Sequence, residues 1–192
     1  MSLTLAPKTL TNQEIDAVLF VSASSPRDHL IIRVAIGTSL RLAEIISLNV
    51  GQVYLDGKTV ARTLVKVKGG DIEDVMFSTR LQSYIADFIS WKIKNGEPVQ
   101  PGSPLFLSNR RKRISARRVQ TVFRELQQKA GLARIHNFHS MRHTAITIHN
   151  EIQGGDIIAT QRFARHKDVR TTLRYIHPSD QRLRESIEAL PY

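Results

Sequence analysis

The spacing of apolar residues along the chain predicts a mainly helical protein. In most segments apolar residues recur every three or four positions, which is the period of an amphipathic helix. These segments begin or end at Ser, Thr, Gly or Pro, the residues that cap or stop helices. We predict helices within residues 8–20, 25–40, 41–48, 78–96 and 115–131, from His139 onward, and within 155–166, 170–177 and 179–190.

Two of these segments carry specific boundary signals. Thr11 and Glu14 have the spacing of a capping box, so the first helix is predicted to begin near residue 12. In the segment 78–96 one apolar stripe is predicted to face the core, and Gly96 to end the helix. The stripe consists of Leu81, Tyr84, Ile85, Phe88 and Trp91.

The middle of the chain has a different pattern. β-Branched residues lie on both sides of the turn signal KGGD, which predicts strands at about 59–67 and 73–77 joined by a short loop. The predicted fold class is therefore mainly α with a small antiparallel β-sheet (α+β). We expect a single domain over residues 1–192.

The charge of the chain points to a polyanionic partner. It has 28 Lys and Arg against 17 Asp and Glu, a net charge of +11, and a pI near 10.4. Such an excess favours nucleic acid over a generic basic protein. The absence of cysteine excludes disulfides, a cysteine nucleophile and zinc–thiolate sites. Since no apolar run approaches a membrane span and no signal peptide opens the chain, we expect a cytoplasmic protein without a membrane partner.

His139, Arg142 and His143 lie within one helical turn and would share a face. Two histidines four residues apart suit a metal, but zinc needs three or four ligands. No acidic residue lies within a turn of either histidine, and Arg142 would repel a dication. We therefore expect no metal here. The alternatives are a solvated helix face and a site that binds an anion, and we favour the anion site.

Separated blocks of sequence resemble the catalytic domain of the tyrosine recombinases, the phage integrase family. TSLRLAEIISLNVGQV contains Arg41, HSMRHTAIT contains the His-x-x-Arg pair, and ARHKDVRTTLRYIHP places a histidine nine residues before a tyrosine. A hairpin lysine also belongs to the pattern; Lys68 fits it best, with Lys66 as the runner-up. The resemblance covers about residues 10–185.

The resemblance implies a site-specific DNA recombinase or integrase. Such an enzyme cuts and rejoins DNA through a covalent 3′-phosphotyrosine and needs no cofactor. Two alternatives remain open: DNA relaxation like that of a type IB topoisomerase, and a catalytically silent DNA-binding accessory protein. The implied catalytic residues are Arg41, Lys68, His139, Arg142, His166 and Tyr175.

The chain departs from the family pattern in a few places. Arg165 stands where the family usually has a glycine, and acidic residues follow the hairpin lysine where the family tends to be basic. The amino-terminal DNA-clamping (core-binding) domain that most members carry is expected to be absent.

The basic residues within 110–118 are expected to contact the DNA backbone. The alternative is that they only form a solvated loop and the first turn of a helix. The expected DNA-contacting residues are Arg110, Arg111, Lys112, Arg113, Arg117 and Arg118, together with His143.

The resemblance also implies how the chain assembles. We expect double-stranded DNA as the partner, a monomer when free, and self-association on DNA into a tetrameric synapse. The segment after Tyr175 is predicted to form an amphipathic helix with an apolar stripe of Leu183, Ile187 and Leu190. The resemblance implies that this stripe docks on a neighbouring subunit; the alternative is that it folds back on its own core.

Overall fold

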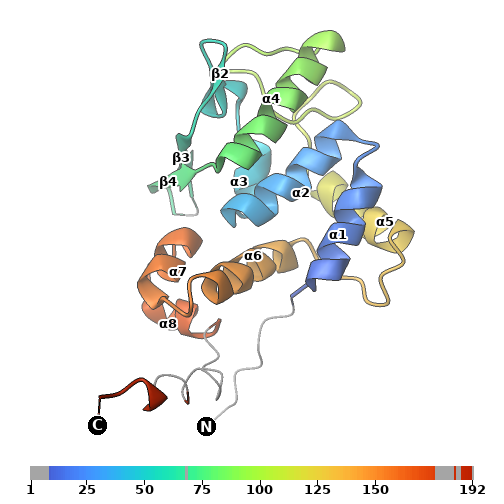
Figure 1. Cartoon of the computed structure of the whole chain (residues 1–192). Coiled ribbons are helices and arrows are strands. Elements are labelled where there is room, and N and C mark those ends of the chain that lie inside the picture. Colours follow the sequence, from blue (N-terminus) through green and yellow to red (C-terminus); the bar gives the residue numbers. More distant parts are fainter. Residues whose placement is uncertain (1–8, 68, 176–183, 185–186, 192) are drawn as a thin grey trace. The chain divides into compact units, whose positions relative to one another are not determined.

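The computed structural model describes residues 9–67, 69–175, 184 and 187–191 (Figure 1). The chain divides into two compact units. The larger unit is Lys8–Ala145, and the smaller unit is Ile146–Tyr192 together with Met1–Pro7. Each is described by itself below, and one catalytic domain over both units stays a prediction.

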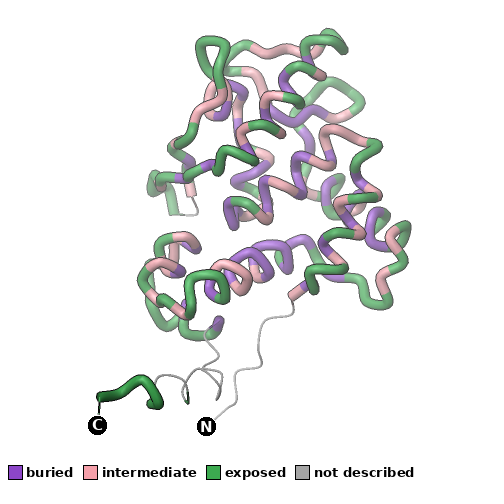
Figure 2. The backbone as a smooth tube through the Cα atoms, viewed as in Figure 1, coloured by how far each residue is buried: buried purple, intermediate pink, exposed green. Residues whose placement is uncertain are grey.

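The larger unit is built from five helices that lie wholly within it and the start of a sixth. They are α1 (Asn12–Ser22), α2 (Pro26–Thr38), α3 (Leu42–Ser47), α4 (Thr79–Lys94) and α5 (Ala116–Lys129), with a short 3-10 turn at Val50–Gln52. α2 packs against α1, α3 and α4, and α5 packs against α1 and α3. Ile31, Val34 and Ala35 of α2 are buried, and α2 contacts three other helices, so it is the centre of this unit. Figure 2 shows buried residues in purple along the backbone.

The predicted helices of this unit are confirmed, and their ends follow from local chemistry. The capping box of Thr11 and Glu14 is formed at the start of α1. Ser78 and Ser115 cap α4 and α5 by accepting hydrogen bonds from backbone N–H groups. Gly96 follows α4 with a φ of +63°, a conformation that glycine adopts without strain. In the predicted stripe of α4, Leu81, Ile85 and Phe88 are buried, while Tyr84 and Trp91 are partly exposed.

The predicted antiparallel pair is present, and a second small one was missed. β3 (Arg62–Lys66) pairs with β4 (Ile72–Met76), close to the predicted bounds. β1 (Tyr54–Leu55) pairs with β2 (Lys58–Thr59) through a turn in which Asp56 and Gly57 both have positive φ. The Asp-Gly pair is the usual signal for such a hairpin turn, so the sequence did contain a sign of it.

The smaller unit contains the end of α6 and two short helices, and it has its own apolar cluster. α6 (His139–Ile152) begins in the larger unit and its residues from Ile146 belong to the smaller one, followed by α7 (Ile157–Ala164) and α8 (Val169–Leu173). α7 packs against α8. Ile146, Ala164 and Tyr175 form the cluster and Phe163 packs against it. The predicted helix in 179–190 lies largely outside the described residues; Ile187 and Leu190 of its stripe are exposed.

None of the described helices is long and apolar enough to cross a membrane.

His29 is a half-buried histidine of the larger unit with hydrogen-bonding neighbours at both ring nitrogens. The Nδ1 atom of His29 lies 2.9 Å from the Ser22 hydroxyl, and the Arg33 Nε–H donates to His29 Nε2 over 2.7 Å. That second bond requires an unprotonated Nε2. Burial, followed by the charge of Arg33, lowers the pKa of His29 below its ordinary value.

We expect the free energy of unfolding to fall as the pH is lowered from 7.5 to 5. Below about pH 6.5 the unfolded chain takes up a proton at His29 that the folded chain resists, so the stabilisation present at neutral pH is lost by at most about 1.4 kcal/mol per pH unit. Urea unfolding at several pH values measures this. His29→Gln should reduce the slope of unfolding free energy against pH without removing it, because the pKa of His139 is lowered as well. An unchanged slope in that variant would show that His29 does not contribute.

Candidate active site

A short turn between α2 and α3 presents Arg41. Ser39 ends α2 in the left-handed conformation, with a φ of +52°, and is fully buried. Arg41 follows at the N-cap of α3. Its Nη1 atom lies 2.8 Å from Glu44 Oε1, and its backbone N–H donates to Glu44 Oε2 over 2.8 Å. Both ends of Arg41 are thus held by one carboxylate.

Glu44 is a further residue next to Arg41 that was not predicted from the sequence. Its carboxylate is buried with only 4% of the side chain exposed, so it is retained in the core by its bonds to Arg41. The available signal was its position three residues after the arginine at a helix start, where a carboxylate reaches back to the N-cap.

The start of α6 is fixed by α5. Gln127 of α5 is fully buried, its amide donates to the His136 carbonyl, and its carbonyl accepts from the His136 N–H over 2.7 Å. The Asn137 side chain then accepts from the Ser140 N–H, which satisfies a free donor at the start of the helix. His139 is therefore presented from a rigid helix start.

Arg142 is brought to the turn that carries Arg41. It is buried with 4% exposure, and its Nη1 donates to the Ser39 carbonyl, two residues before Arg41. This bond joins residues 103 positions apart in the chain. One turn of backbone therefore orders both arginines, Arg41 through Glu44 and Arg142 through Ser39.

His139 lies in the field of both arginines. Burial is the largest cause of a lowered pKa at His139, followed by the charges of Arg142 and then Arg41. A histidine with a lowered pKa is neutral at pH 7 and can accept a proton. The ring of His143 meets that of His139 edge to face, with centroids 4.5 Å apart. The predicted cluster of Arg41, His139 and Arg142 thus comes together.

Of the two candidate hairpin lysines, the structure describes only Lys66. Lys68 lies outside the described residues. Lys66 is exposed at the end of β3, opposite Ile72. An ion pair of 3.4 Å joins Arg62 of β3 to Asp74 of β4. The charge of Asp74, one of the acidic residues after the predicted lysine, is thus paired with an arginine of the same hairpin.

In the smaller unit His166 and Tyr175 lie together. Their rings are stacked with centroids 5.9 Å apart. The His166 Nδ1 lies 3.0 Å from the Thr172 hydroxyl, and the Gln161 amide donates to the His166 carbonyl over 3.0 Å. The side chain of Tyr175 packs in the apolar cluster and the residue is 5% exposed. The Thr172 contact and the stacking orient the His166 ring, the apolar cluster holds the Tyr175 ring, and the Gln161 bond holds the His166 main chain.

Arg165 explains why the family pattern has a glycine before this histidine. It caps the carboxyl end of α7 with a φ of +53°, in the left-handed region. Glycine occupies that region without strain, whereas a residue with a Cβ does so at a cost of about 1 kcal/mol. The backbone at Arg165 therefore has a conformation that suits glycine, although the residue is an arginine.

The basic residues of the run 110–118 differ in their contacts within the protein. Arg113 caps the carboxyl end of α3: its Nη1 donates to the carbonyls of Ile46 (2.8 Å) and Leu48 (3.0 Å). Its Nη2 donates to the Asn49 side chain over 2.6 Å. A cation suits the negative end of a helix. Arg118 lies 3.8 Å from Glu125 in an exposed pair. The side chains of Arg110, Lys112 and Arg117 are exposed and have no hydrogen bond or ion pair within the described ranges.

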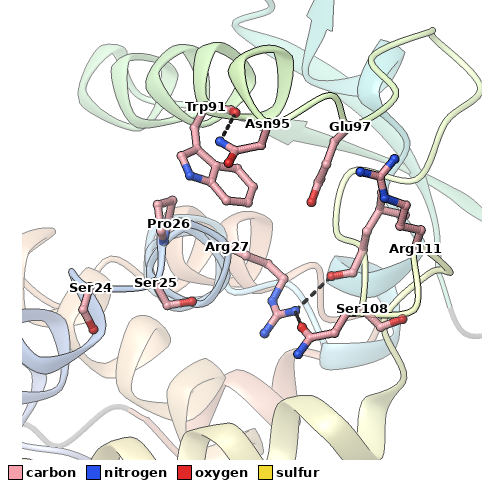
Figure 3. A pocket seen from close by; sticks show the side chains of 11 residues that line it. Ser24, Ser25, Pro26, Arg27, Trp91, Asn95, Glu97, Ser108 and Arg111 are labelled. Carbon is pink, nitrogen blue, oxygen red and sulfur yellow. Dashed lines mark hydrogen bonds between the residues drawn. The ribbon is translucent and has the colours of Figure 1, made fainter.

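Arg111 lines a pocket of about 420 Å³ in the larger unit, together with Trp91 and Arg27 (Figure 3). Arg27 donates to the Leu107 carbonyl over 3.0 Å and holds the turn that carries Arg111. α2 begins at this pocket and ends next to the turn of Arg41. With 13 residues it is about 20 Å long, so the pocket is separate from the arginine cluster.

Among the described residues no three His, Asp or Glu side chains gather as metal ligands would.

Comparison with known proteins identifies the family. The sequence profile of the phage integrase family matches residues 8–182. The chain belongs to the phage integrase family. The predicted resemblance and the predicted mainly helical fold with small antiparallel sheets are confirmed.

The relatives within this family are recombinases. The chain is 31% identical over 166 residues to tyrosine recombinase XerC of Caldanaerobacter subterraneus subsp. tengcongensis, which is 86% of this chain and 45% of the relative. It is 31% identical over 186 residues to XerC of Vibrio parahaemolyticus, which is 95% of this chain and 58% of the relative. The chain therefore spans about half the length of the curated relatives it matches.

Solved structures of the family share the fold. The crystal structure of XerA recombinase matches with a TM-score of 0.78 and 25% identity, over 100% of this chain and 68% of that one. The catalytic domain of bacteriophage HP1 integrase matches over 95% of both chains with a TM-score of 0.65 and 20% identity, which is a likeness of fold. The comparisons give no support to the topoisomerase or accessory-protein alternatives.

Proposed function

We propose that this chain is the catalytic part of a site-specific DNA recombinase that cuts and rejoins DNA through a covalent 3′-phosphotyrosine. The observation that carries the proposal is that Arg41 and Arg142 are both held at the turn between α2 and α3 and both act on His139. In a member of the phage integrase family such a cluster suits a phosphodiester.

The two arginines would bind the phosphate. A phosphodiester carries one negative charge and gains another in the pentavalent transition state, and fixed donors stabilise that charge better than mobile water. Arg41 and Arg142 each offer a bidentate fork to the non-bridging oxygens. His139, neutral at pH 7, would accept the tyrosine proton or donate to an oxygen.

Tyr175 would be the nucleophile. Its phenol oxygen attacks phosphorus, the bond from phosphorus to the 5′ oxygen breaks, and that oxygen takes up a proton. Lys68 is the proposed donor of that proton, with Lys66 as the runner-up. His166 would bond the phosphate or the leaving oxygen. Because the phosphotyrosine conserves the energy of the phosphodiester bond, rejoining needs neither ATP nor a metal.

The proposed partner is double-stranded DNA, and a cytoplasmic location would follow from that substrate. XerH, one of the proteins that share this fold, was solved bound to its difH DNA substrate. We further propose that the chain is a monomer when free and forms a tetrameric synapse on DNA.

A suicide substrate tests the function. A half-site duplex nicked close to the cleavage point loses the short released strand, so the protein–DNA adduct accumulates and is counted on a denaturing gel. We expect adduct formation in excess chelator, and strand exchange with a full site. Relaxation of a supercoiled plasmid without exchange, or no adduct on any duplex, would contradict the proposal.

The clamp on Arg41 gives a prediction for Glu44. Glu44→Gln removes the charge that holds the Arg41 guanidinium, and a small misplacement of such a group costs up to about 10²-fold in rate. We expect adduct formation to slow by about 10–100-fold while the protein stays folded. Single-turnover rates measure this, with Glu125→Gln on the surface of α5 as the control. Equal rates in both variants would remove Glu44 from the site.

The basic run gives a prediction for DNA affinity. Changing Arg110, Lys112 and Arg117 together to Gln should lower the slope of log affinity against log salt by up to about 2.7, since each phosphate contact contributes about 0.9. Arg113→Gln should leave the slope unchanged and lower the melting temperature, because Arg113 caps α3. Titrations at several salt concentrations measure both. A slope that responds only to Arg113 would reverse this assignment.

A further inference from the structure

Asn150 is a buried polar residue in the apolar part of the smaller unit. It lies on α6 one turn after Ile146 of the apolar cluster and is 7% exposed. Burying an amide is unfavourable unless it forms hydrogen bonds. Both polar atoms of the Asn150 side chain, Nδ2 and Oδ1, form hydrogen bonds.

The Asn150 side chain connects three segments. Its Nδ2 donates to the Tyr175 carbonyl over 3.2 Å. Its Oδ1 accepts from the hydroxyl of Thr160, a fully buried residue of α7, over 3.4 Å. The backbone N–H of Tyr175 donates to the Thr172 carbonyl over 2.9 Å. Both main-chain polar groups of Tyr175 therefore have a protein partner, and one of the two is Asn150.

The main chain at Tyr175 determines where its phenol oxygen lies. Two side-chain torsions separate the Cα atom from the reacting oxygen, so a small rotation of the backbone moves that oxygen by about 1 Å, a displacement that can cost about 10²-fold in rate. The neighbouring ring of His166 is held by the Thr172 hydroxyl, and the His166 main chain by Gln161. The side-chain bonds of Asn150 go instead to Tyr175 and Thr160. Asn150 thus acts on the tyrosine and not on the histidine.

We propose that Asn150, held by Thr160, is a positioning residue that fixes the nucleophilic Tyr175 for attack. The proposal rests on the proposed function, because it assigns a role relative to that nucleophile. Asn150 acts through the backbone of Tyr175 and touches neither DNA nor the reacting atoms. A purely structural role would lower stability or affinity, whereas a positioning role lowers the rate of attack in folded, DNA-bound protein.

The test measures the rate of adduct formation under single-turnover conditions with the half-site saturated. Asn150→Leu keeps the volume and removes both bonds, and Thr160→Val removes only the Thr160–Asn150 bond. We expect Asn150→Leu to slow attack by about 10–100-fold and Thr160→Val by a smaller factor. Melting temperature and half-site affinity are measured alongside. Asn95→Leu, at the exposed carboxyl end of α4, is the matched control.

A second substrate separates attack from departure of the leaving group. With sulfur in place of the bridging 5′ oxygen, the leaving group needs no proton. If Asn150 positions the nucleophile, its variants are slowed by the same factor on both substrates. Recovery of the rate on the sulfur substrate would instead place Asn150 on the leaving-group side and overturn the proposal.

The remaining outcomes also decide the question. Variants that bind and cleave at the wild-type rate, or that slow only in proportion to lost folding or affinity, overturn the proposal. If Asn150→Leu does not fold, wild-type cleavage by a folded Thr160→Val overturns it. If wild-type protein forms no adduct at Tyr175, it is the proposed function that has failed, which is distinguishable from a normal wild type with insensitive variants.

Discussion

Tyr175→Phe is expected to abolish covalent attachment to DNA while half-site affinity stays within about twofold of the wild type. The phenylalanine ring keeps the packing against Ile146, Ala164 and Phe163, so the smaller unit should fold. Only the attacking oxygen is removed, and loss of a nucleophile in a covalent mechanism lowers rates by more than about 10³-fold. The adduct assay on the nicked half-site measures the loss.

The wild-type adduct provides the positive control. Mass spectrometry of the digested complex should find the nucleotide on Tyr175. An adduct on Tyr54, Tyr84 or Tyr192, or residual attachment by the phenylalanine variant, would contradict the assignment.

Arg142→Lys is expected to slow adduct formation by about 10²–10³-fold, the loss seen when one fixed donor to a transition-state anion is removed. Lysine keeps the charge but not the planar fork that bonds two phosphate oxygens. The substitution also disturbs the bond to the Ser39 carbonyl, and a buried carbonyl without its partner costs about 1–3 kcal/mol.

The two effects of Arg142→Lys are measured separately. Chemical unfolding reports the loss of stability, and single-turnover cleavage at a temperature where the variant is folded reports the loss of rate. Arg124→Lys, on the exposed side of α5, is the control for the exchange itself. A folded Arg142→Lys variant that cleaves within threefold of the wild type would remove Arg142 from phosphate binding.

Much of the fold could be predicted because its signals are local. The capping box at Thr11, the serine caps of α4 and α5, and the Gly96 stop each depend on residues within one turn, and all were predicted from the sequence or follow the predicted bounds. The hairpin of β1 and β2 was missed although its Asp-Gly turn is local, because its strands are only two residues long.

The order of the sequence blocks identified the family, since blocks in a fixed order need no knowledge of packing. The role of individual charges did need it. Six basic residues of one run were predicted to contact DNA, and that stays a prediction. The tertiary structure adds that Arg113 caps α3 and that Arg111 lines a pocket at the far end of α2. Contacts between residues far apart in the chain decide which side of a loop packs against another element. The pattern of charges along the sequence does not predict those contacts.

The sequence by itself therefore determined the helices, the hairpin and the chemical types at Arg41, His139, Arg142, His166 and Tyr175, because periodicity, caps and motif spacing are properties of neighbouring residues. Only the tertiary structure decided how these residues are held. The Ser39 carbonyl reaches Arg142 across 103 residues, and Asn150 reaches the Tyr175 carbonyl across 25. Such bonds form when buried polar groups need partners once the core has closed, and the partner is whichever group the packing brings within reach.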